Sequence, residues 1–103
     1  MPDILVTEQI DGEAMESLKS EFDVAYSPQL WREPARIREI IGDYRGIIVR
    51  NQTRVDSSLI DAGKSLLVIG RAGVGLDNVD AKAASEAGIV VAFTPEQNSI
   101  SVA

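Results

Sequence analysis

Two arginines and a run of glycines follow apolar segments of this sequence, and these residue types are suited to holding a small anion. Arg50 comes directly after "GIIV", and Arg71 comes directly after "LLVIG". Each guanidinium offers a planar fork that can bind a carboxylate or a phosphate with two hydrogen bonds. The turn at residues 72–75 can aim successive backbone N–H groups at one point, and its glycines let a ligand approach the main chain closely. Together these residues predict a site for a small acid.

Each of these features also has a purely structural interpretation. A strand-end arginine often pairs with a surface carboxylate, and a pair of glycines often serves only to make a tight turn. The interpretation as a binding site depends on two arginines flanking one glycine turn, in a chain whose formal net charge is −6. Asp77, Asn78 and Asp80 follow the turn and are predicted to be turn and cap residues.

The glycine spacing does not match a dinucleotide-binding loop. Gly70, Gly73 and Gly75 give G-x-x-G-x-G after the fourth apolar run. The dinucleotide fingerprint is G-x-G-x-x-G after the first strand of a βαβ unit, with an acidic residue about 20 positions further on. No acidic residue stands at that distance at the end of a following strand, so this turn is not expected to bind a dinucleotide.

Composition excludes several classes of function. The chain is 45% apolar and 25% charged, which is typical of one globular domain, and it contains no cysteine and no histidine. The commonest general base and metal ligand is therefore absent, and we expect no catalytic residue and no metal site. The net charge of −6 argues against nucleic acid and membrane surfaces as partners, and no apolar run approaches the roughly 20 residues of a membrane span. We expect a cytoplasmic protein.

Five short apolar runs alternate with helical patterns along the chain. The runs are continuous and rich in β-branched residues, as in strands that are buried on both faces. They lie at residues 4–6, 24–26, 47–49, 66–69 and 89–93. Strand and helix in alternation predict parallel βαβ units with right-handed crossovers. The fold class is therefore α/β: a flavodoxin-like five-stranded parallel sheet in the order 2-1-3-4-5, with helices on both faces and ligands at the carboxyl ends of the strands.

The residues at those strand ends exclude two functions that are known for related folds. A response-regulator receiver needs an acidic pair after the first strand, an aspartate after the third and a lysine after the fifth, and this chain has Glu8-Gln9, Arg50-Asn51 and Thr94-Pro95 there. A flavodoxin needs a phosphate loop rich in serine and threonine after the first strand, which residues 7–12 do not provide.

Three segments resemble the amino-terminal portion of the D-2-hydroxyacid dehydrogenases. They are "GIIVRNQTRV", "LLVIGRAGVGLDNVDAKAASEAGIVV" and "NSISVA", and they occur in the family's order and at its separations. The branches that look most similar are the D-3-phosphoglycerate dehydrogenases and the sulfolactate dehydrogenases. The resemblance implies that residues 1–97 are an incomplete substrate-binding domain, which in the family is completed by a helix returning from the carboxyl terminus. Residues 98–103 would begin the hinge helix to an NAD-binding domain. The chain stops inside the first turn of that helix, so we expect a truncated fragment.

The resemblance also implies roles for individual residues. Arg50 and Asn51 would face the substrate, and Arg71 would set the loop and the charge of the substrate site. The remaining implied residues are the backbone amides of Gly73, Val74 and Gly75 for the carboxylate, Val74 again for the nicotinamide side of the cleft, and Asn98 and Ser101 for the hinge.

The function that follows is the substrate-binding lobe of an NAD-dependent dehydrogenase, which would hold the carboxylate of a small anionic 2-hydroxy or 2-oxo acid. The family's catalytic arginine, glutamate and histidine and its dinucleotide loop would all lie beyond residue 103. We therefore expect the fragment alone to be inactive and to bind no NAD, although the parent enzyme would use it. The alternative is a stand-alone or excised flavodoxin-like binding or scaffold domain. Such a domain would self-associate as a homodimer through an exposed apolar sheet face.

Overall fold

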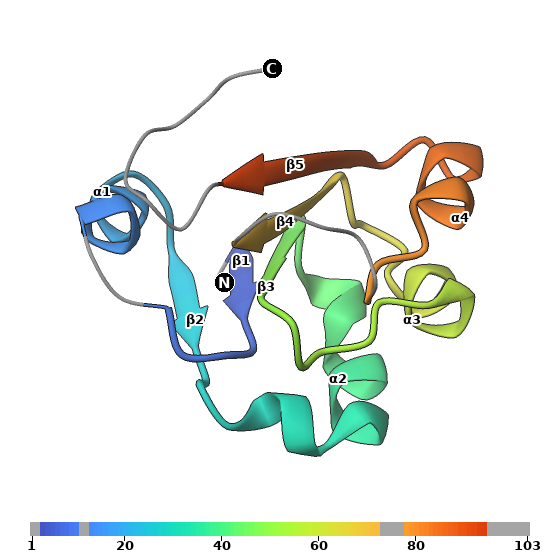
Figure 1. Cartoon of the computed structure of the whole chain (residues 1–103), viewed down its shortest axis with the longest axis horizontal. Coiled ribbons are helices and arrows are strands. Elements are labelled where there is room, and N and C mark those ends of the chain that lie inside the picture. The colour runs from blue at the N-terminus through green and yellow to red at the C-terminus, as the bar shows by residue number, and fades with distance from the viewer. Residues whose placement is uncertain (1–2, 11–12, 73–77, 95–103) are drawn as a thin grey trace.

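Five parallel strands form one sheet in the order β2-β1-β3-β4-β5, which confirms the predicted topology (Figure 1). The structure is a computed structural model that describes residues 3–10, 13–72 and 78–94. The strands are β1 (Ile4–Val6), β2 (Val24–Tyr26), β3 (Gly46–Val49), β4 (Val68–Ala72) and β5 (Val90–Thr94). The helices are α1 (Glu13–Glu21), α2 (Pro34–Ile40), α3 (Ser57–Ala62) and α4 (Ala81–Glu86), with 3-10 turns at Leu30–Arg32 and Ile41–Asp43.

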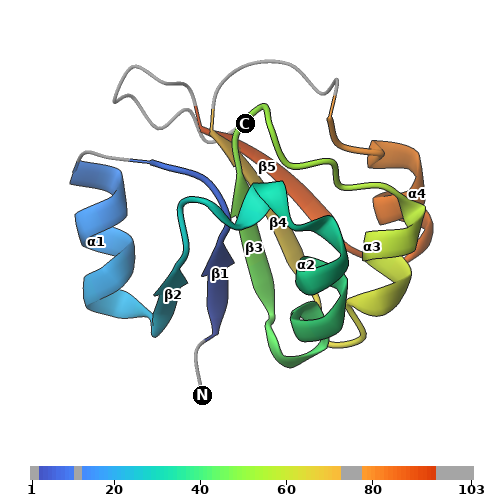
Figure 2. The ribbon, with the colours of Figure 1, turned by 90° about the horizontal axis from the view of Figure 1, so that it is seen from below.

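The helices cover the two faces of the sheet unequally. Helices α2, α3 and α4 lie on one face, and α1 lies on the other, beside β1 and β2 (Figures 1 and 2). This arrangement follows from the right-handed crossovers of parallel strands on either side of the point where the strand order reverses. Among the described residues, Val68 of β4 and Val90 of β5 are neighbours in register and leave 36% and 63% of their surface exposed.

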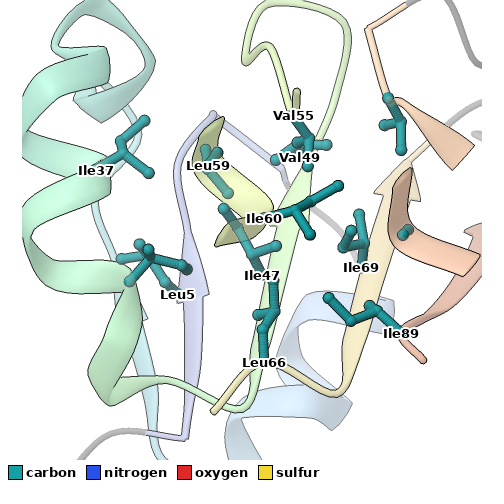
Figure 3. Close-up of a cluster of buried hydrophobic side chains, with 13 residues drawn as sticks. Leu5, Ile37, Ile47, Val49, Val55, Leu59, Ile60, Leu66, Ile69 and Ile89 are labelled. Carbon is teal, nitrogen blue, oxygen red and sulfur yellow. The ribbon is translucent and has the colours of Figure 1, made fainter. Parts of the chain in front are cut away.

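The main core lies between the sheet and helices α2, α3 and α4. Leu5 and Ile47 from the strands meet Ile37 of α2 and Leu59 of α3 in this core (Figure 3). Each such side chain contributes about 1.5–3 kcal/mol through burial of apolar surface. A smaller cluster of Ile4, Val6 and Met15 joins α1 to the opposite face.

Side chains cap the first turns of α3 and α4, and one of them is the predicted cap residue Asp80. Oδ1 of Asp56 accepts the N–H of Leu59 at 3.1 Å, and Oδ1 of Asp80 accepts the N–H of Ala83 at 3.0 Å. Gly88 ends the α4 segment with a φ of +78°, a conformation that a residue without a Cβ adopts at little cost. These caps fix where α3 and α4 begin, and both helices begin at the carboxyl edge of the sheet.

The boundaries of β3, β4 and β5 differ from the predicted ones, and the difference is largest for β4. The fourth strand runs from Val68 to Ala72, so Arg71 lies inside β4 and not after it. Helix α2 ends at Ile40, and a 3-10 turn continues the chain to Asp43. Helix α1 ends before Phe22, whose side chain is 46% exposed.

Candidate functional site

The polar residues of interest gather where β1, β3 and β4 end, at the carboxyl edge of the sheet. β1 is followed by Thr7 and Glu8, β3 by Arg50–Thr53, and β4 contains Arg71 near its end. Strand order reverses between β1 and β3, which is where open parallel sheets bind ligands. The three segments are far apart in sequence and adjacent only in the folded sheet.

The carboxylate of Glu8 organises the segment after β3. Glu8 is only 2% exposed, and its Oε2 accepts the backbone N–H groups of Arg50 at 2.6 Å and Thr53 at 3.0 Å. Its Oε1 accepts the N–H of Gln52 at 2.9 Å. Beside it, the hydroxyls of Thr7 and Thr53 are 2.7 Å apart and share a hydrogen bond. The amides of this segment thus already surround an anion, and that anion is the protein's own carboxylate.

The side-chain amide of Asn78 binds the same segment through its carbonyl groups. Nδ2 donates to the carbonyl oxygen of Arg50 at 2.6 Å and to that of Thr53 at 2.7 Å. Oδ1 accepts the Nε–H of Arg71 at 2.8 Å. Because arginine can only donate, this contact fixes which end of the amide is the oxygen. Asn78 therefore connects the ends of β3 and β4.

The two arginines have different surroundings. Arg71 is 7% exposed, and its Nη1 also points to the carbonyl oxygen of Ala72 at 3.4 Å. Arg50 is exposed, and its Nη1 lies 3.5 Å from the carbonyl oxygen of Gln9. Arg50 can therefore reach a ligand from solvent, whereas Arg71 is held within the protein by Asn78. Asn51, next to Arg50, is exposed as well.

The structure brings some of the predicted site residues together and does not describe the others. Arg50, Asn51 and Arg71 share the carboxyl edge of β3 and β4, and Asn78 bridges the two strand ends. The remaining predicted residues lie outside the described part of the chain: Gly73, Val74, Gly75, Asn98 and Ser101.

A shallow groove next to this edge is lined mainly by polar residues, namely Arg54, Val55, Asp56, Asn78, Val79 and Asp80. Its two aspartates cap α3 and α4, so their carboxylates have structural partners. Over residues 3–10, 13–72 and 78–94, no group of three or more histidine, cysteine or acidic residues could hold a metal ion. Within the same ranges, every helix is too short or too polar to cross a bilayer.

Sequence reasoning missed Glu8 and Asn78. Glu8 was weighed only as one member of a receiver's acidic pair, and Asn78 was predicted to be a turn residue. The position of Glu8 could have indicated its role, since an acidic residue close to the end of a fully buried strand needs hydrogen-bond donors. For Asn78, no local pattern distinguishes a bridging amide from a turn amide.

Comparison with known proteins identifies the family. Residues 4–103 match the domain family described as "D-isomer specific 2-hydroxyacid dehydrogenase, catalytic domain". The chain belongs to this family. The predicted resemblance to this family is thereby confirmed.

Curated relatives include enzymes of two activities. The D-3-phosphoglycerate dehydrogenase of Archaeoglobus fulgidus is 46% identical over 101 residues, which are 97% of this chain and 19% of that enzyme. The (S)-sulfolactate dehydrogenase of Chromohalobacter salexigens is 38% identical over 103 residues, which are 100% of this chain and 33% of that enzyme. This 2-hydroxyacid dehydrogenase domain thus spans between a fifth and a third of the length of these relatives.

Solved structures show the same fold. A Pyrococcus horikoshii protein superposes with a TM-score of 0.81 at 30% identity, covering 90% of this chain and 27% of that protein. The NAD+-bound 3-phosphoglycerate dehydrogenase of Entamoeba histolytica gives a TM-score of 0.77 at 29% identity, covering 91% of this chain and 33% of that enzyme.

Proposed function

We propose that this domain holds the carboxylate of a small anionic 2-hydroxy or 2-oxo acid for an NAD-dependent dehydrogenase. The observation that carries the proposal is the convergence of Arg50, Asn51 and Arg71 at the carboxyl edge of the sheet through the amide of Asn78. Arg50 would supply a bidentate contact to the acid from the exposed side, and Asn51 a neutral donor beside it.

The relatives suggest which acid to test. Phosphoglycerate and sulfolactate, named in the activities of two of them, are both small acids with a second anionic group. The exposed guanidinium of Arg50 is a positive group that can pair with one anionic group of such an acid.

The cofactor is proposed to belong to another part of the parent enzyme. The amides of Arg50, Gln52 and Thr53 surround the Glu8 carboxylate, so the strand-order reversal cannot take a diphosphate there. These three amides are therefore not available to the diphosphate of NAD. In this proposal residues 1–97 bind the acid, Gly73, Val74 and Gly75 contribute backbone amides, and Val74 faces the nicotinamide. Residues 98–103, with Asn98 and Ser101, open the hinge.

In the same proposal, this chain is inactive by itself because the catalytic groups belong to the rest of the parent enzyme. That parent would be a cytoplasmic enzyme.

A chimera tests the full function. This chain would replace the matching 101 residues of the Archaeoglobus enzyme, to which it is 46% identical. We expect the chimera to oxidise D-3-phosphoglycerate or (S)-sulfolactate with NAD, and the 103-residue chain to oxidise neither. A folded chimera that is inactive on both acids would contradict the proposal.

A titration tests the binding step alone. Amide shifts in ¹H–¹⁵N spectra of the 103-residue chain would be followed as D-3-phosphoglycerate is added. We expect Kd near 1 mM, equivalent to about −4 kcal/mol, and Arg50→Ala should weaken binding about tenfold through the loss of a charged hydrogen bond. Arg38→Ala is the matched control because Arg38 is an exposed arginine on α2, and it should leave Kd unchanged. If the two variants raise Kd equally, Arg50 contributes to binding only through the net charge of the chain, which would contradict its proposed direct contact.

A second candidate function is a self-associating binding or scaffold domain. It is favoured by the exposed apolar side chains of Leu67, Val68 and Val90 next to the sheet face that α1 leaves open. Contiguous exposed apolar residues of this kind are common at protein interfaces. Sedimentation at several concentrations should then show a homodimer that Val90→Lys disrupts, and a monomer at every concentration would exclude this function.

A further inference from the structure

Two side chains form hydrogen bonds with the main chain of residues 50–53, one as an acceptor and the other as a donor. The Glu8 carboxylate accepts the N–H groups of Arg50, Gln52 and Thr53. The Asn78 amide donates to the carbonyl groups of Arg50 and Thr53. One side chain thus satisfies the donors of this segment and the other satisfies its acceptors. Buried backbone groups that are paired in this way hold a loop in one conformation.

Asn78 differs from Glu8 because it also reaches the neighbouring strand. Its Oδ1 accepts from Nε of Arg71 while its Nδ2 holds the carbonyl of Arg50. The backbone around Asn78 is anchored as well, since its carbonyl accepts the N–H of Val55 at 2.7 Å and Val55 pairs with Val79 in an isolated parallel bridge. The amide is therefore held in place, and it contacts both the side chain of Arg71 and the main chain of Arg50.

We propose that Asn78 is a positioning residue for acid binding. It orients the Arg71 guanidinium and the backbone from which the Arg50 side chain projects, with Glu8 supporting the same loop from the other side. Asn78 itself does not touch the acid. This inference rests on the proposed function, because Arg50 is the arginine proposed to contact the acid.

Replacement of Asn78 by aspartate isolates the role of its donors. Aspartate has nearly the same shape and keeps an acceptor for Arg71, but it turns acceptor oxygens toward the carbonyls of Arg50 and Thr53. Two short donor contacts, at 2.6 and 2.7 Å, are thereby replaced by repulsive ones. Asn78→Ala removes all three contacts without adding charge, and it serves as the second variant if Asn78→Asp does not fold.

Asp80→Ala is the matched control. Asp80 is two positions along the chain and caps α4 by accepting the N–H of Ala83. No hydrogen bond described for its side chain reaches residues 50–53. Its loss should lower the stability of the domain without changing the geometry of the loop.

The experiment measures hydrogen exchange and binding in the same samples. We expect amides of residues 50–53 to exchange about tenfold or more faster in Asn78→Asp, and Kd for D-3-phosphoglycerate to rise about tenfold, the equivalent of one lost hydrogen bond. In the active chimera, KM for the acid should rise similarly, with KM for NAD within about twofold of the unmutated chimera. Asp80→Ala should change neither the exchange of residues 50–53 nor Kd.

Two results would overturn the inference. One is acid binding by the Asn78 variants with unchanged Kd, and the other is an equal loss of binding in Asp80→Ala. If the unmutated chain binds no acid, the proposed function fails separately. In that case the positioning role in acid binding falls with the proposed function, and faster exchange confined to residues 50–53 would show only that Asn78 holds the loop.

Discussion

The substitution Glu8→Gln tests whether a buried carboxylate holds the loop that follows β3. Oε2 of Glu8 accepts two N–H groups at 2.6 and 3.0 Å, and Oε1 accepts one at 2.9 Å. Glutamine has one acceptor oxygen, so it can satisfy Arg50 and Thr53 while its NH₂ group faces the N–H of Gln52. The variant is isosteric and creates no cavity, so the effect reports on charge and hydrogen bonding.

The magnitude follows from the contacts that change. One N–H loses its acceptor in a site where Glu8 is 2% exposed, which costs about 1–3 kcal/mol. Two further bonds lose their ionised acceptor, and charge-assisted bonds are roughly twice as strong as neutral ones, which adds about 1–2 kcal/mol. We expect a loss of about 3 kcal/mol from a total free energy of unfolding of about 5–10 kcal/mol for a domain of this size.

Urea unfolding followed by fluorescence of Trp31 measures this loss. Trp31 is the only tryptophan, and its backbone N–H donates to the carbonyl oxygen of Thr7 at 3.1 Å, so Trp31 lies next to the residue that precedes Glu8 in the chain. Glu39→Gln is the control because Glu39 is exposed on α2, and it should change stability by less than about 0.5 kcal/mol. If Glu8→Gln and Glu39→Gln unfold at the same midpoint with the same slope, the reasoning about Glu8 is refuted.

Three further variants test the stability of the fold that positions the site, and each is measured by its midpoint of urea unfolding. Gly88→Ala should cost about 1–2 kcal/mol of stability, because the φ of +78° disfavours any residue with a Cβ. No atom lies within 4 Å of the added methyl, so the cost would come from the backbone alone. An unchanged midpoint would mean that the backbone relaxes freely at this position. Ile47→Ala removes a side chain that is 0% exposed in the main core and should cost about 2–5 kcal/mol; a cost below 1 kcal/mol would show that the core collapses around the gap. Asp56→Ala removes the cap on the Leu59 amide and should cost about 1 kcal/mol, whereas Ser57→Ala, next to it, should cost less.

The sheet could be predicted because each strand carries apolar side chains at consecutive positions. Burial on both faces explains this pattern for β1, whereas Val68 of β4 and Val90 of β5 are apolar and partly exposed. The alternation with helical patterns then leaves few topologies, and the observed order is the predicted one. The cap at Asp80 was equally visible, because capping acts within a few residues of the chain.

The end of β4 could not be predicted in the same way. Reading apolar runs ends a strand at its first charged residue, which would stop this one before Arg71. In the fold, Arg71 pairs with Val49 of β3 and with Phe93 of β5, so ladder hydrogen bonds on both sides extend the strand. A charged residue is tolerated there because Asn78 accepts from its Nε. The boundary was therefore determined by tertiary contacts that the local sequence does not contain.

The position of Glu8 explains why this fold has its candidate site beside the usual one. In open parallel sheets the amides at the strand-order reversal commonly bind a ligand's phosphate. Here the amides of Arg50, Gln52 and Thr53 are bonded to a carboxylate of the chain itself. A substrate anion would have to displace Glu8, which is 2% exposed and holds three donors, or bind next to it. Displacement would leave a buried charge without partners, which costs several kcal/mol. The lower-energy arrangement is an acid beside Glu8, on the exposed side of the loop, where the Arg50 side chain lies.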